Sequence, residues 1–196
     1  MYGIGDANAG NANDLYTICT STGAATLITQ IDGAALTAIG FGPDGTLYGA
    51  GDDAAGTELL TIGSTTGAAA LVGSIAPVDA FGGARSLAFV DGMLFTNGIG
   101  DQLLAVNVVT GLGTLVGDSG TQSALQGLAT PDGATLYGVT YAPGETSNSL
   151  YTLSTSTGVA SFVLNFDGPF QPVAQVSWPD GHSSERDEVR KYLGCL

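Results

Sequence analysis

Basic residues are nearly missing from this sequence. Its 196 residues include 4 lysines and arginines against 18 aspartates and glutamates, a formal net charge of −14. Residues 1–180 contain a single base, Arg85. A surface without basic patches repels phosphate backbones and anionic lipids, so we expect no nucleic-acid partner. No apolar run approaches the roughly 18 residues that a membrane-spanning helix needs, so we expect no membrane insertion.

Residues that bind metals through nitrogen or sulfur are also scarce. There is one histidine, and the two cysteines, Cys19 and Cys195, lack the paired spacing of a zinc site. They are either two free thiols or one long-range disulfide. The scarcity of lysine indicates a secreted or cell-surface protein. No basic segment followed by an apolar one occurs at Met1, so we expect an export signal to be missing from this chain.

What the sequence has in abundance is repetition. Leu15, Leu59, Leu103 and Leu150 each open a short apolar segment, at spacings of 44, 44 and 47 residues. A Thr-Gly pair follows each segment. These pairs are Thr22-Gly23, Thr66-Gly67, Thr110-Gly111 and Thr157-Gly158. Self-similarity at this period is typical of propellers and solenoids.

One repeat, from about residue 36 to 75, illustrates the unit. An apolar run over 36–41 ends in Pro43-Asp44-Gly45, which is a hairpin signal because proline pre-sets φ and glycine accepts a positive φ. Further strands are predicted over 46–49, 59–62 and 68–72, with a polar loop at 51–56. Four short antiparallel strands per repeat describe a propeller blade. A β-sandwich would not require four copies of one unit.

The order of strands at the two ends extends this prediction. With the strands of a blade labelled A to D from the axis outward, the chain opens on a B strand at 1–4 and closes on a lone A strand at 172–178. We therefore predict an all-β, four-bladed propeller over 1–181, in which the last strand completes the first blade. The predicted blades are 1–31 with 172–181, 32–78, 79–119 and 120–171. The alternatives are a fragment of a larger propeller or half of one assembled from two chains.

Residues 182–196 form a polar tail in which a short helix is predicted. This tail is a docking element or a foreign extension.

The repeated pattern of Leu-Tyr-x-Ile, Thr-Gly and Leu-Tyr-Gly segments is similar to bacterial secreted propeller repeats. It resembles the NHL, SMP-30-like and lactonase-like propellers, and Tyr48-Gly49, Leu87-Ala88-Phe89 and Pro131-Asp132-Gly133 carry the resemblance. These motifs are strand and turn signals, so they imply a fold and not an activity. The metal-ligand and catalytic residues of lactonases have no recognisable counterpart here.

The predicted topology places most acidic residues at one end of the blades, where the D–A and B–C loops emerge. Carboxylate clusters suit Ca²⁺ or another divalent cation. The alternative is a solvated acidic surface that keeps an apolar protein soluble. The candidate ligands are Asp6, Asp52, Asp101 and Glu145 beside B–C loops, and Asp32, Asp79, Asp118 and Asp167 in D–A loops. The opposite end holds turn aspartates, for which local backbone hydrogen bonds are a sufficient reason.

Arg85 and the cysteines are the remaining candidates. Arg85 lies on the acidic side, where it either anchors a carboxylate or phosphate or offsets neighbouring acids. A bond between Cys19 and Cys195 would tie the first blade to the tail in an oxidising compartment. That arrangement resembles hemopexin-type four-bladed propellers, although the repeat motifs differ.

Three functions remain open. The first is an extracellular, non-catalytic propeller that acts in binding or as a scaffold. One version of this hypothesis adds a cation that stabilises the propeller. The second is a metal-dependent hydrolase of lactones, esters or phosphoesters, with Asp52 or Asp101 as base. The third is a carbohydrate-binding lectin. The expected partner is a small molecule, a glycan or a surface protein, and we expect a monomer, with a dimer as the alternative.

Overall fold

The computed structural model describes residues 1–5, 13–31, 35–53, 56–75, 83–98, 101–121, 123–140 and 147–167. Asp52, Asp53 and Asp167 are described by their backbone alone. These residues form strands and turns, and within them no helix is long and apolar enough to cross a membrane.

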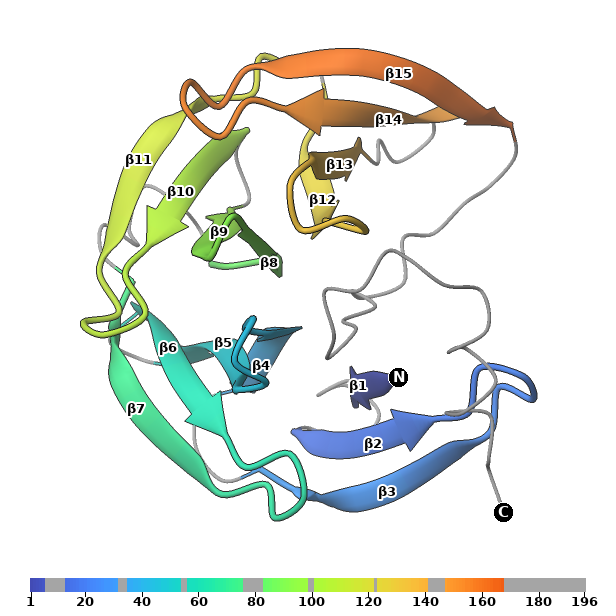
Figure 1. The fold of residues 1–196 in the computed structure, drawn as a ribbon, viewed down its shortest axis with the longest axis vertical. Coiled ribbons are helices and arrows are strands. Elements are labelled where there is room, and N and C mark those ends of the chain that lie inside the picture. Colours follow the sequence, from blue (N-terminus) through green and yellow to red (C-terminus); the bar gives the residue numbers. More distant parts are fainter. Residues whose placement is uncertain are drawn as a thin grey trace.

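The described residues form fifteen strands in four antiparallel sheets arranged around a common axis (Figure 1). Each sheet follows chain order from the axis outward, as a propeller blade requires. Blade 1 contains β1 (Tyr2–Ile4), β2 (Asp14–Ile18) and β3 (Ala25–Gln30). Blade 2 contains β4 (Ala35–Phe41), β5 (Leu47–Asp53), β6 (Gly56–Ile62) and β7 (Ala69–Ser74). Blade 3 contains β8 (Ser86–Val90), β9 (Met93–Asn97), β10 (Gln102–Val106) and β11 (Gly113–Asp118). Blade 4 contains β12 (Leu125–Ala129), β13 (Leu136–Thr140), β14 (Ser147–Leu153) and β15 (Ala160–Asp167).

The all-β, four-bladed propeller is thus confirmed. Blade 1 opens on its B strand as predicted, and three of its strands are described. The predicted closing strand at 172–181 and the predicted short helix in 182–196 lie outside the described residues.

The loop predicted at 51–56 is shorter than expected. β5 continues to Asp53 and β6 begins at Gly56, because Asp52 pairs with both Ala35 and Thr57. A strand ladder depends on backbone hydrogen bonds, so it extends through residues whose polar side chains indicated a loop.

The Thr-Gly pairs close the turns between the C and D strands. Each glycine has a positive φ, between +69° and +78°, which only glycine adopts without strain. The preceding threonine hydroxyl accepts a hydrogen bond from the backbone N–H two residues on, as at Thr66 and Ala68 (3.3 Å). The pair therefore recurs because the turn needs both residues.

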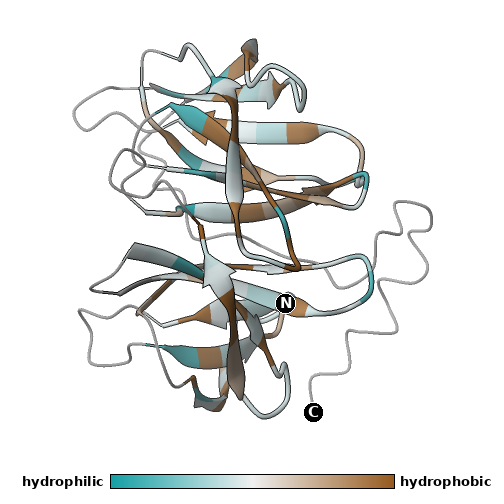
Figure 2. Ribbon diagram, turned by 90° about the vertical axis from the view of Figure 1, so that its left-hand side faces the viewer, coloured by the Kyte–Doolittle hydropathy of each residue, from teal (hydrophilic) through white to brown (hydrophobic). Residues whose placement is uncertain are grey.

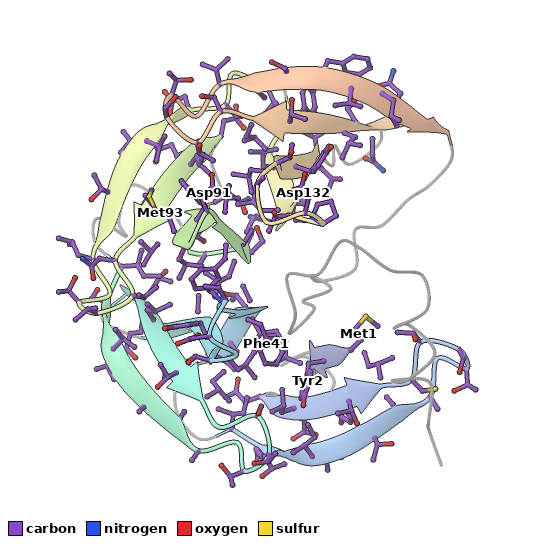
Figure 3. All side chains as sticks on the ribbon, in the orientation of Figure 1. Met1, Tyr2, Phe41, Asp91, Met93 and Asp132 are labelled. Atoms are coloured by element: carbon purple, nitrogen blue, oxygen red, sulfur yellow. The ribbon has the colours of Figure 1, made fainter. Side chains whose placement is uncertain are left out.

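The core lies between the blades. Among the described residues it consists of three clusters of buried hydrophobic side chains, one at each junction of successive blades. Tyr2 and Phe41 meet edge to face at the first junction, with ring centroids 5.1 Å apart (Figure 3). Figure 2 shows hydrophobic residues along the strands and hydrophilic ones mainly near the turns. Stacking buries both faces of the inner strands, which explains why they do not alternate between polar and apolar residues.

Candidate functional site

The strand directions divide the described acidic residues between the two ends of the blades. We call the end at which each A strand begins the D–A rim, and the opposite end the A–B rim. The D–A rim carries Asp14, Asp52, Asp53, Glu58, Asp101, Asp118 and Asp167. The A–B rim carries Asp44, Asp91 and Asp132. The structure thus gathers the candidate ligands that it describes on one rim.

Two of the A–B rim aspartates, Asp44 and Asp132, accept local hydrogen bonds. Asp44 accepts hydrogen bonds from the Thr46 backbone N–H (3.0 Å) and hydroxyl (2.9 Å), and these bonds lower the pKa of its carboxyl below 3.8. Asp132 accepts from the backbone N–H groups of Thr135 (2.7 Å) and Ala134 (3.0 Å), with the same effect on its pKa. The Asp91 backbone N–H donates to the Gly133 carbonyl of the next blade (2.8 Å), beside Asp132 in Figure 3. Turn hydrogen bonds therefore explain Asp44 and Asp132, and Asp91 adopts the positive φ (+49°) of a turn residue.

Arg85 occupies the opposite rim, immediately before β8. Its backbone N–H donates to the Asn97 carbonyl (2.9 Å), which fixes the start of the innermost strand of blade 3. Its guanidinium Nη1 donates to Oε1 of Gln126, on the innermost strand of blade 4. Ser86 and Gly127 occupy equivalent register positions, and Arg85 and Gln126 are the residues that immediately precede them. The contact therefore joins equivalent positions of two neighbouring blades.

A buried polar pair supports this arginine. Ser86 and Asn97 are 1 % and 0 % exposed and lie opposite each other in the β8–β9 ladder. The Ser86 hydroxyl donates to Asn97 Oδ1, and Asn97 Nδ2 donates to the Leu125 carbonyl of blade 4 (2.8 Å). A buried amide with both ends bonded is fixed in one orientation. The pair therefore locks the two inner strands that carry Arg85 and Gln126.

The repeat is broken at this pair. The residue that pairs with the repeated leucine is Asn97 in blade 3, but Ile4, Ala50 and Val139 in blades 1, 2 and 4. The partner of Asn97 is Ser86, where blades 2 and 4 carry Ala38 and Gly127. Aligning the repeats would have revealed Ser86 and Asn97, whereas their bond to Leu125 depends on how the blades stack.

Arg85 retains hydrogen-bonding capacity. Its Nε is buried without a partner, and among the described residues its guanidinium makes no ion pair with a carboxylate. The side chain as a whole is only partly buried. The neighbouring acids predicted to offset its charge are thus not in contact with it in the described part of the chain.

Asp101 and Asp118 form a second feature of blade 3. Burial raises the pKa of the Asp101 carboxyl, the Asp118 charge raises it further, and a Thr121 hydrogen bond opposes both effects. Thr121 Oγ1 lies 2.9 Å from the buried Ser119 Oγ, and the Ser119 backbone N–H donates to the Asp101 carbonyl (2.7 Å). Two of the predicted ligands are therefore close enough for their charges to interact.

The described residues contain no group of three or more carboxylate, histidine or cysteine side chains able to hold a metal. Of the predicted ligands, Asp6, Asp32, Asp79 and Glu145 lie outside the described residues, and Asp52 and Asp167 are placed only by their backbone. A divalent-cation site at this rim stays a prediction.

Cys19 follows β2 and is buried, with its Sγ 3.2 Å from Ser21 Oγ. Its predicted partner, Cys195, lies outside the described residues, so the disulfide stays a prediction too.

Comparison with solved structures shows propeller proteins. A virginiamycin B lyase from Staphylococcus aureus matches with a TM-score of 0.51 at 15 % identity, over 82 % of this chain and 50 % of the lyase chain. A calcium-binding regucalcin from Agrobacterium tumefaciens matches with a TM-score of 0.52 at 15 % identity. The match covers 92 % of this chain and 66 % of the regucalcin chain. A putative TolB from the same organism matches with a TM-score of 0.55 at 13 % identity. The match covers 79 % of this chain and 57 % of the TolB chain.

This chain thus spans about half to two thirds of the length of these propellers, and at such identities the likeness shows the fold alone. In sequence, no family model and no curated protein matches this chain.

Proposed function

We propose that this protein is an extracellular, non-catalytic binding propeller, and that its D–A rim holds a small molecule carrying a carboxylate at Arg85. The observation that carries the proposal is the partly buried guanidinium that joins blades 3 and 4 through Gln126 and makes no ion pair with a described acid. Guanidinium donors form a planar fork that matches the two oxygens of a carboxylate.

The chain's negative charge does not rule out an anionic ligand. At physiological ionic strength, interactions between exposed charges fade beyond about 8 Å, so the groups beside the ligand decide its affinity. The described group that accepts a hydrogen bond from the Arg85 guanidinium is the uncharged amide of Gln126. A carboxylate would therefore meet an arginine whose charge no described acid neutralises.

The support beneath Arg85 favours binding by a rigid site. Asn97 and Ser86 are buried and bonded, so the strands that carry Arg85 and Gln126 lose little further freedom when a ligand binds. The hydrolase alternative and the cation-stabilised version depend on the candidate carboxylates, of which only the Asp101 and Asp118 side chains are described, and no described feature favours the lectin alternative. They stay predictions.

The test compares glucuronate with glucose, which differ by a carboxylate in place of a hydroxymethyl group. We expect glucuronate to bind with a Kd on the order of 1 mM. Its addition to ¹⁵N-labelled protein should shift the NMR signals of Arg85, Gln126 and their neighbours, whereas glucose should leave them unchanged.

Arg85→Gln should abolish the glucuronate shifts, and Arg85→Lys should weaken binding because a lysine keeps the charge and loses the fork. Equal shifts with both sugars would favour the lectin alternative. Binding of glucuronate that survives in Arg85→Gln would refute the proposed site.

A further inference from the structure

An Asp-Gly pair occurs in each of the three described turns between an A and a B strand. The pairs are Asp44-Gly45, Asp91-Gly92 and Asp132-Gly133, and all three aspartates are exposed. At such a pair the backbone nitrogen of the glycine can attack the aspartyl carboxyl, because glycine has no Cβ to hinder the approach. The dipeptide is the same in all three blades, so a difference in reactivity between them must come from the turns.

The turns of blades 2 and 4 hold the aspartate in place. The Asp44 carboxylate accepts hydrogen bonds from the Thr46 backbone N–H (3.0 Å) and hydroxyl (2.9 Å). The Gly45 N–H, which contains the nitrogen that would attack, donates within its own turn (2.9 Å). Asp132 accepts from the Thr135 backbone N–H (2.7 Å) and hydroxyl (2.9 Å). These bonds lower the pKa of both carboxyls and favour the ionised form, which cannot lose water.

The blade 3 turn is shorter and leaves its aspartate unheld. Val90 pairs with Met93, so Asp91 and Gly92 alone make the turn, with φ of +49° and +77°. Two positive φ values describe a type I′ turn. Among the described residues, neither the Asp91 carboxylate nor the Gly92 N–H has a hydrogen-bond partner. A Cβ added at Gly92 would meet nothing within 4 Å, so there is room for a ring to close.

We propose that Asp91 is a site of spontaneous isomerisation to isoaspartate. The Gly92 nitrogen attacks Cγ of the Asp91 acid form, a C–N bond forms, and a C–O bond breaks. The departing hydroxyl takes the nitrogen's proton and leaves as water. One water then adds to the five-membered imide and opens one of its two C–N bonds. Opening on the backbone side leaves a chain that runs through Cγ, with the original composition.

The modification changes a contact between blades. Isoaspartate adds one backbone methylene between Asp91 and Gly92, in a turn of two residues. Val90 and Met93 are the last pair of the β8–β9 ladder, and the Asp91 backbone N–H donates to the Gly133 carbonyl of blade 4 (2.8 Å; Figure 3). A longer turn displaces both interactions. Isomerisation therefore weakens the A–B rim contact of blades 3 and 4 as the protein ages.

The test incubates the folded full chain in mildly acidic buffer at physiological temperature and follows the three pairs by peptide mapping. Endoproteinase Asp-N does not cleave at isoaspartate, and electron-transfer fragmentation locates the added methylene. We expect isoaspartate to form at least about tenfold faster at Asp91 than at Asp44 or Asp132, where hydrogen bonds must first break. Asp91→Glu should abolish the signal of this turn, because the attack would have to close a larger ring, and should leave the other two rates unchanged.

Asn97-Gly98 reports whether the reaction belongs to the folded state. Asn-Gly pairs deamidate through the same attack, and in an unfolded chain they react faster than Asp-Gly pairs. In the fold the Asn97 amide is buried and bonded at both ends, so it should stay intact while Asp91 isomerises. Isomerisation of Asp91 only where Asn97 also deamidates would overturn the proposal, as would equal rates at the three Asp-Gly pairs. In urea the three rates should converge, and a preference for Asp91 that persists there would overturn it too.

Discussion

Replacing Gly111 by alanine tests whether the blades are held together by direct backbone contact. Gly111 has a φ of +78° and lies against Gly73 of the preceding blade. Gly45→Ala is the reference variant, because Gly45 has a φ of +80° and nothing within 4 Å of an added Cβ. The two substitutions share the backbone strain and differ only in the contact.

The expected magnitudes follow from these geometries. A left-handed conformation costs a residue with a Cβ about 1–2 kcal/mol, so Gly45→Ala should lower the free energy of unfolding by about that amount. The Gly111 methyl would lie 2.6 Å from the Gly73 carbonyl carbon and oxygen, where backbone and not a flexible side chain must move. Overpacking of this kind adds about 1–3 kcal/mol, so Gly111→Ala should cost about 2–5 kcal/mol in total.

Urea unfolding followed by tryptophan fluorescence and circular dichroism measures both variants, with the slope compared to confirm that the unfolding transition is unchanged. Gly158→Ala, with a methyl 2.7 Å from the Gly117 carbonyl, should behave like Gly111→Ala. Equal unfolding midpoints for Gly45→Ala and Gly111→Ala would refute the view that the turn glycines are needed for close approach of the blades.

Two further predictions concern the polar groups of blade 3. Asn97→Ala should lower the free energy of unfolding by about 2–4 kcal/mol, because it leaves the Ser86 hydroxyl and the Leu125 carbonyl buried without partners. The double variant Ser86→Ala/Asn97→Ala should be more stable than Asn97→Ala in urea unfolding, since one unpaired group is removed. The raised pKa of Asp101 means that the folded state binds its proton more tightly, so this carboxylate destabilises the fold above that pKa and the cost disappears as pH falls through it. Asp101→Asn should therefore raise the Tm at pH 7 and change it progressively less on acidification.

The fold was predictable because its determinants are local and repeated. A single repeat contains its own strand and turn signals, and Asp44, Thr66 and Gly67 make in the structure the turn contacts that their residue types predict. The sorting of acidic residues onto one rim followed from strand order alone. Strand ends were less accurate, since Asp52 pairs in a ladder although its side chain indicated a loop.

The contacts between blades were beyond sequence reasoning. Arg85 was predicted either to anchor an oxyanion or to offset neighbouring acids, and nothing in the sequence indicated its hydrogen bond to Gln126 of the next blade. Nothing in the pattern around Asn97 reveals that its amide bonds to Leu125, because that contact depends on the stacking of two sheets. Likewise, the repeated glycines announce turns, but their second role against Gly73 and Gly117 appears only when the blades are assembled.

The Ser86–Asn97 pair also bears on how a chain of near-identical repeats reaches the right assembly. Strands from self-similar blades can exchange partners during folding, and such misassembly is a known hazard of repeat proteins. If β9 paired with the inner strand of blade 2 or blade 4, Asn97 would face Ala38 or Gly127 and would be buried without the serine hydroxyl. Unpaired buried polar groups cost about 1–3 kcal/mol each. Among the three blades whose innermost strand is described, this single polar pair thus makes incorrect exchange of blade 3 strands unfavourable, in addition to supporting Arg85.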